Sequence, residues 1–164
     1  MASGQTLLVF NALSGTAPST NFATLDQRNN HAVLDFDAAV AESIDFEQLL
    51  PRNYNGGGIT AVIVWSAATA TTGNVKWNLA FERHQDEVDD TDSDSFAAAQ
   101  TVTATAPTTN GARQYSSIAF TDGAQIDSLA AGESFRVRLT RDAANAADTM
   151  VGDAEFARLE LRET

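Results

Sequence analysis

The chain has 164 residues, of which 43% are apolar, and this suits one globular domain with its own core. It carries 22 Asp and Glu against 10 Lys and Arg, so its net charge is -12 and its pI is about 4.3. Nucleic acids and anionic membranes are bound through clustered cations, so this excess of acids argues against both partners. The chain has no cysteine, which excludes disulfides and thiolate metal sites.

The N-terminal segment, MASGQTLLVFNALSG, lacks the basic and apolar regions of an export signal. No stretch approaches the roughly 20 apolar residues of a membrane span. We therefore expect a chain that is made and folded in a cytoplasm.

Residues 1–30 are rich in small and polar residues, interrupted by apolar runs at Leu7 to Phe10 and Phe22 to Leu25. Such a composition is a poor basis for independent folding. It fits either an extended N-terminal arm or an edge strand. Residues 31–164 are expected to form the folded domain.

The first half of that domain alternates apolar and polar residues in the period of a strand. His31 to Asp37 predicts one strand, whereas Ala38 to Leu50 is compatible with a strand or a short helical turn that ends before Pro51. After a glycine-rich loop, Gly58 to Arg83 predicts two strands joined by a short polar turn.

Each of these two strands carries a tryptophan, Trp65 or Trp77, on its apolar face. An aromatic side chain buries about 150–250 Å², so we expect this pair to form the centre of the core. The alternative is that both tryptophans form a surface that binds a ligand.

Four further strands are predicted at residues 98–105, 114–121, 133–141 and 153–162. The last alternates imperfectly: the mismatch between Phe156 and Leu159 indicates either a β-bulge or a helix. We favour a strand, because the short link to the preceding strand fits antiparallel pairing. Seven or eight strands with almost no helix predict an all-β sandwich or barrel.

No catalytic motif is present, and His31 and His84 lie far apart in the sequence, so we expect neither an enzyme nor a cofactor. The candidate metal ligands are Asp90, Asp92 and Asp94, which match the first, third and fifth positions of a calcium loop. The rest of that pattern fails, and the alternative is a solvated acidic loop.

Arg136, Arg138 and Arg141 form a basic stripe along one predicted strand. In so acidic a chain, we expect their partners to be its own carboxylates, either within the fold or across a subunit contact.

Five segments together are similar to small jelly-roll proteins encoded among the structural genes of tailed bacteriophages and prophages. They are LDFD (34–37), LPRNYNGGG (50–58), TTGNVKWNLAFER (71–83), DSDSF (92–96) and AGESFRVRLTRD (131–142). The resemblance implies an antiparallel jelly-roll β-sandwich of about eight strands, preceded by an arm that grips a shell. It also implies a homotrimeric virion component.

The first hypothesis for the function is therefore a capsid decoration (cement) protein that binds the major capsid protein and stabilises a phage head. Under it, deleting residues 2–30 is expected to leave a folded sandwich that no longer binds particles.

The alternative is a tail-associated receptor-binding or carbohydrate-binding module, whose partner is a glycan. Such a module stacks sugar rings on exposed aromatic side chains, and the candidates are Tyr54, Tyr115, Trp65 and Trp77. A hydrolase would need a pair of carboxylates in a cleft, and no motif indicates one.

Overall fold

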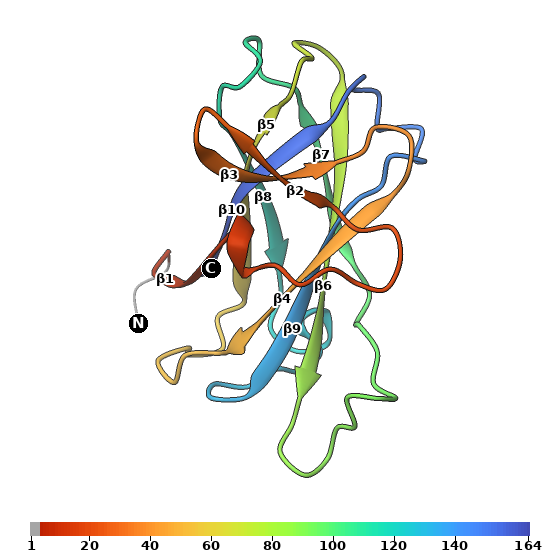
Figure 1. Cartoon of the computed structure of the whole chain (residues 1–164). Coiled ribbons are helices and arrows are strands. Elements are labelled where there is room, and N and C mark those ends of the chain that lie inside the picture. The colour runs from red at the N-terminus through yellow and green to blue at the C-terminus, as the bar shows by residue number, and fades with distance from the viewer. Residues whose placement is uncertain (1–3) are drawn as a thin grey trace.

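The computed structural model describes residues 4–164 as two antiparallel β-sheets packed face to face (Figure 1). The six-stranded sheet, sheet A, has the order β2-β3-β10-β5-β8, with β1 also paired to β10, and the four-stranded sheet, sheet B, has the order β4-β9-β6-β7. The predicted all-β antiparallel sandwich is confirmed. The strands are β1 (Thr6–Asn11), β2 (Thr24–Arg28), β3 (His31–Phe36), β4 (Glu42–Leu49), β5 (Ile59–Ala67), β6 (Asn74–His84), β7 (Gln100–Thr105), β8 (Gln114–Phe120), β9 (Ser134–Arg141) and β10 (Ala154–Glu163), and the short 3-10 helices are η1 (Ala12–Ser14) and η2 (Ala124–Ile126).

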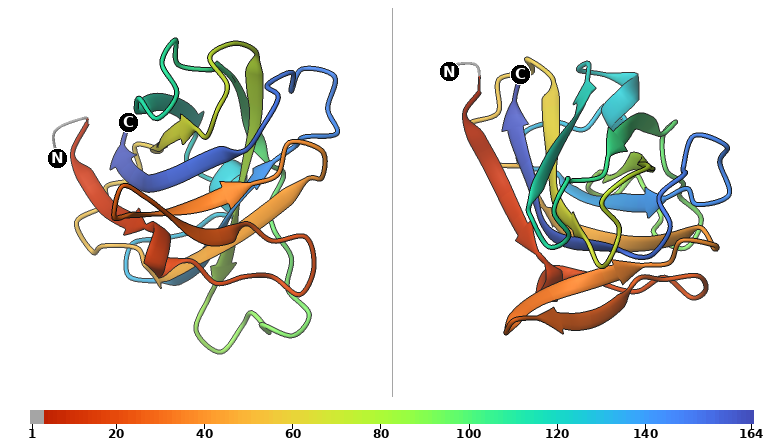
Figure 2. Two further views of the ribbon diagram at one scale, coloured as in Figure 1. Left: turned by 45° about the horizontal axis from the view of Figure 1, so that its top comes forward. Right: turned by 90° about the horizontal axis from the view of Figure 1, so that it is seen from above.

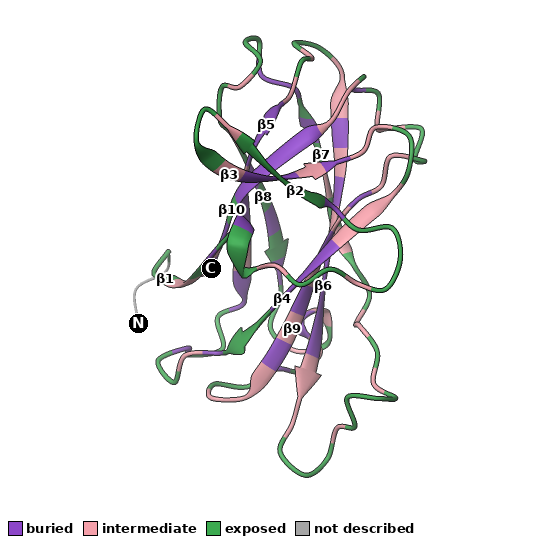
Figure 3. Cartoon of the chain, viewed as in Figure 1, coloured by how far each residue is buried: buried purple, intermediate pink, exposed green. Residues whose placement is uncertain are grey.

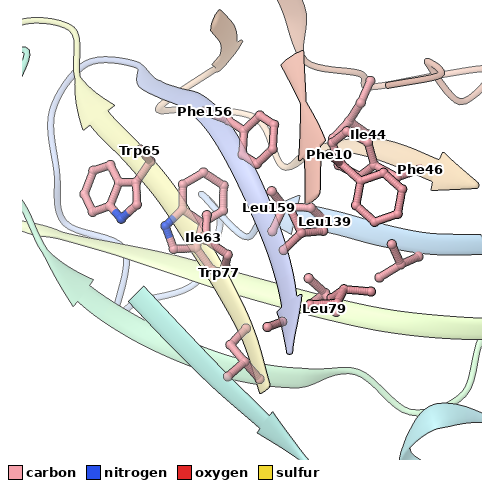
Figure 4. Close-up of a cluster of buried hydrophobic side chains, with 14 of the residues drawn as sticks. Phe10, Ile44, Phe46, Ile63, Trp65, Trp77, Leu79, Leu139, Phe156 and Leu159 are labelled. Atoms are coloured by element: carbon pink, nitrogen blue, oxygen red, sulfur yellow. The ribbon is translucent and has the colours of Figure 1, made fainter. Parts of the chain in front are cut away.

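The core lies between the sheets, and the predicted burial of both tryptophans is confirmed (Figure 4). Trp65 and Trp77 have no exposed surface, and their ring centroids lie 5.9 Å apart in an edge-to-face arrangement. Trp65 Nε1 donates to Ser116 Oγ at 3.0 Å, so this indole N–H is satisfied inside the core.

The two tryptophan strands belong to opposite sheets: β5 pairs with β8 and β10, whereas β6 pairs with β7 and β9. The turn between them therefore crosses from one sheet to the other. The segment with two possible structures, residues 38–50, contains a strand, β4, whose side chains Ile44 and Phe46 enter the core.

Of the two alternatives for residues 153–162, the favoured strand forms as β10, and it carries the β-bulge, because its register against β5 shifts between Phe156 and Arg158. The expected pairing with the preceding strand is wrong, since β10 pairs with β1, β3 and β5 and not with β9. The physical reason is that β10 is buried on both of its faces, as a strand in the middle of a sheet is. Outward residues such as Glu155 and Ala157 are buried as well, which suits the centre of a sheet (Figure 3).

Residues 4–30 do not form an extended arm; they form the other alternative, strands at the edge of a sheet. β1 pairs with β10 and β2 pairs with β3, so each adds a strand at an edge of sheet A (Figure 2). Phe10 is buried, and its ring lies 5.2 Å from that of Phe46 in sheet B. The apolar run in β1 therefore completes the core of its own chain. Neither short helix in residues 4–164 has the length and apolar character of a membrane span.

Candidate functional site

A cleft of about 750 Å³ opens on the outer face of sheet A, away from the core. Its lining comes from β1, η1, the β2–β3 hairpin, β5, the loop before β8, β8 itself and β10. The lining residues are Asn11, Ala12, Leu13, Arg28, Asn29, Asn30, His31, Ala32, Val64, Gly111, Arg113, Tyr115, Ala157 and Arg158.

Four of these residues form a row that crosses the sheet. Asn11 on β1 is the register partner of Arg158 on β10, Arg158 is the partner of Val64 on β5, and Val64 is the partner of Tyr115 on β8. Adjacent strands are about 4.8 Å apart, so the row spans roughly 14 Å. We call these four residues the cross-strand row.

The bulge in β10 places Arg158 in that row. Phe156 and Leu159 both enter the core, and the extra residue between them lets the strand keep this pattern. The same point of β10 is where its neighbour changes, from β3 at Phe156 to β1 at Arg158. Ala157 is buried at the cleft, whereas Arg158 is exposed.

The β2–β3 hairpin forms one wall. Its turn residues Asn29 and Asn30 have φ angles of 47° and 63°, the left-handed conformation that a two-residue hairpin turn requires and that asparagine tolerates. The turn sets Arg28 opposite His31, and both line the cleft.

Arg28 closes one end of the cleft. Its Nη1 donates to Glu155 Oε2 at 2.9 Å and to the carbonyl of Ala68 at 3.1 Å. The loop before β8 packs onto the same guanidinium: a Cβ on Gly111 would lie 2.6 Å from Arg28 Nε, and the φ of Gly111 is +77°. The positive φ favours glycine here, and a larger residue would also have to push the Arg28 guanidinium aside.

Tyr115 is the only one of the four predicted aromatic candidates that is exposed, at 68%. Tyr54 is buried, donates to Asp122 Oδ1 at 2.7 Å and accepts from the N–H of Gly58 at 3.1 Å. Burial and the bond to Asp122 raise the pKa of Tyr54. Tyr54 and both tryptophans thus hold the fold together.

Two of the three candidate metal ligands, Asp90 and Asp94, accept hydrogen bonds from their own loop. Asp90 Oδ1 accepts from the N–H of Asp92 at 3.0 Å, and Asp94 Oδ1 accepts from the N–H of Ser95 at 2.8 Å. Across residues 4–164, no group of three or more His, Cys, Asp or Glu side chains is arranged to hold a metal ion.

All three stripe arginines bind carboxylates within the chain, as expected, and the partner of Arg141 is Asp148, at 2.8 Å. Arg138 makes a two-pronged contact with Asp45 at 2.7 and 2.8 Å, and Arg136 Nε donates to Glu82 Oε2 at 3.0 Å. Arg141 does not share their face. In a period of two it points inward with Leu139, and it is fully buried.

The two histidines lie on opposite sheets and do not form a common site. His31 is exposed on the hairpin wall of the cleft, whereas His84 Nε2 lies 3.1 Å from Glu82 Oε1 on sheet B.

Sequence reasoning missed Asn11, Arg28, Arg113 and Arg158, because the pairing of the six strands of sheet A brings them together. Two sequence signals pointed toward the site. The alternation of residues 114–121 sets Tyr115 opposite the apolar Ile118 and Phe120, and the mismatch after Phe156 marks the bulge that exposes Arg158.

No protein-family model matches the chain, and no curated protein matches it. In structure it is similar to three carbohydrate-binding modules, each at 9% sequence identity. The CBM22-1 xylan-binding domain of Paenibacillus barcinonensis Xyn10C has a TM-score of 0.53, with 99% of this chain and 96% of that chain covered. The CBM36-1 domain of a multidomain xylanase from the hindgut metagenome of Trinervitermes trinervoides has a TM-score of 0.51, with 94% of each chain covered. The module CBM6cm-2 from Cellvibrio mixtus lichenase 5A, in complex with cellotriose, has a TM-score of 0.51, with 98% and 99% covered.

This chain has their jelly-roll β-sandwich fold. The jelly roll implied by the phage resemblance is thereby confirmed. Nothing in the comparisons indicates a phage origin.

Proposed function

We propose that this protein is a non-catalytic carbohydrate-binding module and that the cleft on sheet A holds the sugar. The observation that carries the proposal is the cross-strand row, in which the exposed ring of Tyr115 lies in one line with Val64, Arg158 and Asn11. A sugar ring has an apolar C–H face and a rim of hydroxyl groups. An aromatic ring on a rigid sheet can stack on the C–H face, and the hydrogen-bonding side chains beside it can bind the hydroxyl groups.

The architecture supports the same ligand class. The three similar modules carry names that refer to xylan, xylanase and cellotriose, and their fold is the fold of this chain. Because one fold serves many functions, the site itself must carry the argument.

The decisive experiment replaces Tyr115. The purified protein is first tested for binding to xylan, mannan, mixed-linkage β-glucan and polygalacturonate by affinity electrophoresis, and then titrated calorimetrically with oligosaccharides of whichever polymer binds. Tyr115→Ala is expected to weaken binding about tenfold or more, equivalent to about 1.4 kcal/mol, because the stacking surface is lost.

Tyr115→Phe is the matched control and is expected to keep most of the affinity, since it retains the ring. The thermal unfolding midpoint should change little in either variant, because Tyr115 is exposed. Binding to none of the polymers, or unchanged affinity in Tyr115→Ala, would overturn the proposal.

A place in a virion, with the major capsid protein as partner and a trimeric state, stays a prediction from the phage resemblance. Quantitative mass spectrometry of purified particles tests it: hundreds of copies would indicate decoration of the head, and a handful a position at the tail.

A further inference from the structure

We propose that the cleft binds a glycan that carries carboxylate groups, such as a uronic-acid oligosaccharide, through Arg113 and Arg158. The inference rests on the proposed function and specifies the class of sugar that the site takes.

The charge of the cleft is opposite to that of the chain. The chain has 22 acidic residues against 10 basic ones. Yet the lining of the cleft includes Arg28, Arg113 and Arg158, and none of its described residues is an aspartate or a glutamate. A neutral sugar does not need this concentration of guanidinium groups.

Arg113 and Arg158 have no acidic partner. Considering residues 4–164, no carboxylate forms an ion pair within 4.0 Å of either guanidinium, whereas Arg28 is paired with Glu155. Their hydrogen bonds use Nη1 alone: Arg158 Nη1 donates to the carbonyl of Ala157 at 2.8 Å, and Arg113 Nη1 donates to Ser66 Oγ at 3.3 Å. An arginine has five N–H donors, so both keep donors for a ligand.

The arginines also lie close enough to repel one another. Partial burial lowers the pKa of Arg113, and the positive charges of Arg158 and Arg28 lower it further, against an opposing effect of Glu155. A carboxylate bound among these groups would offset that repulsion.

The cross-strand row places the cations where an acidic sugar could use them. Arg158 and Tyr115 are the register partners of Val64 on its two sides, so each backbone lies about 4.8 Å from that of β5. A ring lying over the half-buried Val64 would have an aromatic face on one side and a guanidinium on the other. The planar fork of arginine matches the two oxygens of a carboxylate.

The net charge of -12 does not prevent this binding at physiological salt. The Debye length there is about 8 Å, so distant carboxylates are largely screened from a short oligosaccharide in the cleft. Contacts at hydrogen-bond distance are screened much less.

The test is calorimetric titration at 0.15 M salt with short oligosaccharides of galacturonate, of mannuronate and guluronate, and of glucuronate-substituted xylan. Each is paired with its carboxyl-reduced form, which keeps the sugar backbone and removes the charge. At least one acidic oligosaccharide is expected to bind tenfold or more tightly than its reduced partner. Arg113→Gln and Arg158→Gln are each expected to lose most of that preference.

Arg162→Gln is the matched control, because Arg162 lies on β10 outside the cleft lining and should leave the preference intact. Thermal unfolding verifies that every variant is folded. Equal binding of acidic and reduced forms would overturn the inference and leave the proposed function standing, whereas no binding of any form would overturn both. If the preference for the acidic form survives in both variants, the carboxylate binds elsewhere, and the assignment to Arg113 and Arg158 is overturned.

Discussion

Asp35 on β3 is the side chain whose acidity the fold changes most clearly in this part of sheet A. Burial, with the charges of Asp26 and Glu155 close by, raises its pKa from 3.8 to about 7. Asp35 forms no ion pair among the described residues, and its Oδ1 is buried without a hydrogen-bond partner there. The folded protein is therefore more stable when the Asp35 carboxyl group is protonated.

This raised pKa makes stability depend on pH. Between about pH 4 and 7 the folded state holds a proton that the unfolded state has released, so the contribution of Asp35 to stability is lost as the pH rises through 7. Asp35→Asn keeps the shape and cannot ionise. Its thermal unfolding midpoint is expected to exceed that of the unchanged protein at pH 8 and to converge with it near pH 4. A difference that is constant across this range would contradict the raised pKa.

At the scale of elements, the buried Arg141 joins β9, β3 and the loop 142–153. Its Nη2 donates to Asp148 Oδ1 at 2.8 Å and to the carbonyl of Met150 at 2.9 Å, and its Nη1 donates to the carbonyl of Phe36 at 3.1 Å. The exposed fractions of the Arg141 and Asp148 side chains are 0% and 1%. This ion pair thus holds a long loop across the end of the sandwich.

Arg141→Met is expected to lower the free energy of unfolding by about 3–5 kcal/mol, because Asp148 is left buried and unpaired. Urea denaturation followed by tryptophan fluorescence measures this loss. Arg162→Met is the control, because Arg162 is only half-buried and forms no ion pair among the described residues, and it should cost no more than about 1 kcal/mol. Similar losses in both variants would show that the buried pair contributes little.

At the scale of the whole molecule, the N-terminal residues are part of the sandwich. β1 and β2 supply two strands of sheet A, and Phe10 and Ala23 are buried. The sequence-based expectation that the sandwich folds without residues 2–30 does not agree with this arrangement.

Deleting residues 2–30 is now expected to unfold the protein. Loss of a buried phenylalanine alone costs about 3–5 kcal/mol, and the net stability of a domain is only about 5–15 kcal/mol. Near-ultraviolet circular dichroism measures the loss of tertiary packing directly, since Trp65 and Trp77 are packed against each other in the folded state. A cooperative thermal transition with a native near-ultraviolet spectrum in the truncated chain would contradict the expectation.

The sequence by itself determined most of the strands after residue 31 and their inward faces, whereas residues 1–30 and 38–50 each kept two alternatives. The alternation around Trp65, Trp77 and Phe135 predicted which side chains are buried, and the mismatch after Phe156 marked the place where β10 has its bulge, with a helix as the alternative. These features are local, because the direction of a side chain follows from the extended backbone of its own strand and from a period of two.

The tertiary structure decided which strands are neighbours, and with that the site. It placed the tryptophan strands in opposite sheets, put β10 beside β1 rather than β9, and brought Asn11, Arg158 and Tyr115 into one row. Strand pairing depends on registers between segments far apart in the chain, which no local period encodes. A cleft assembled from six strands is therefore visible only once the sheet has formed.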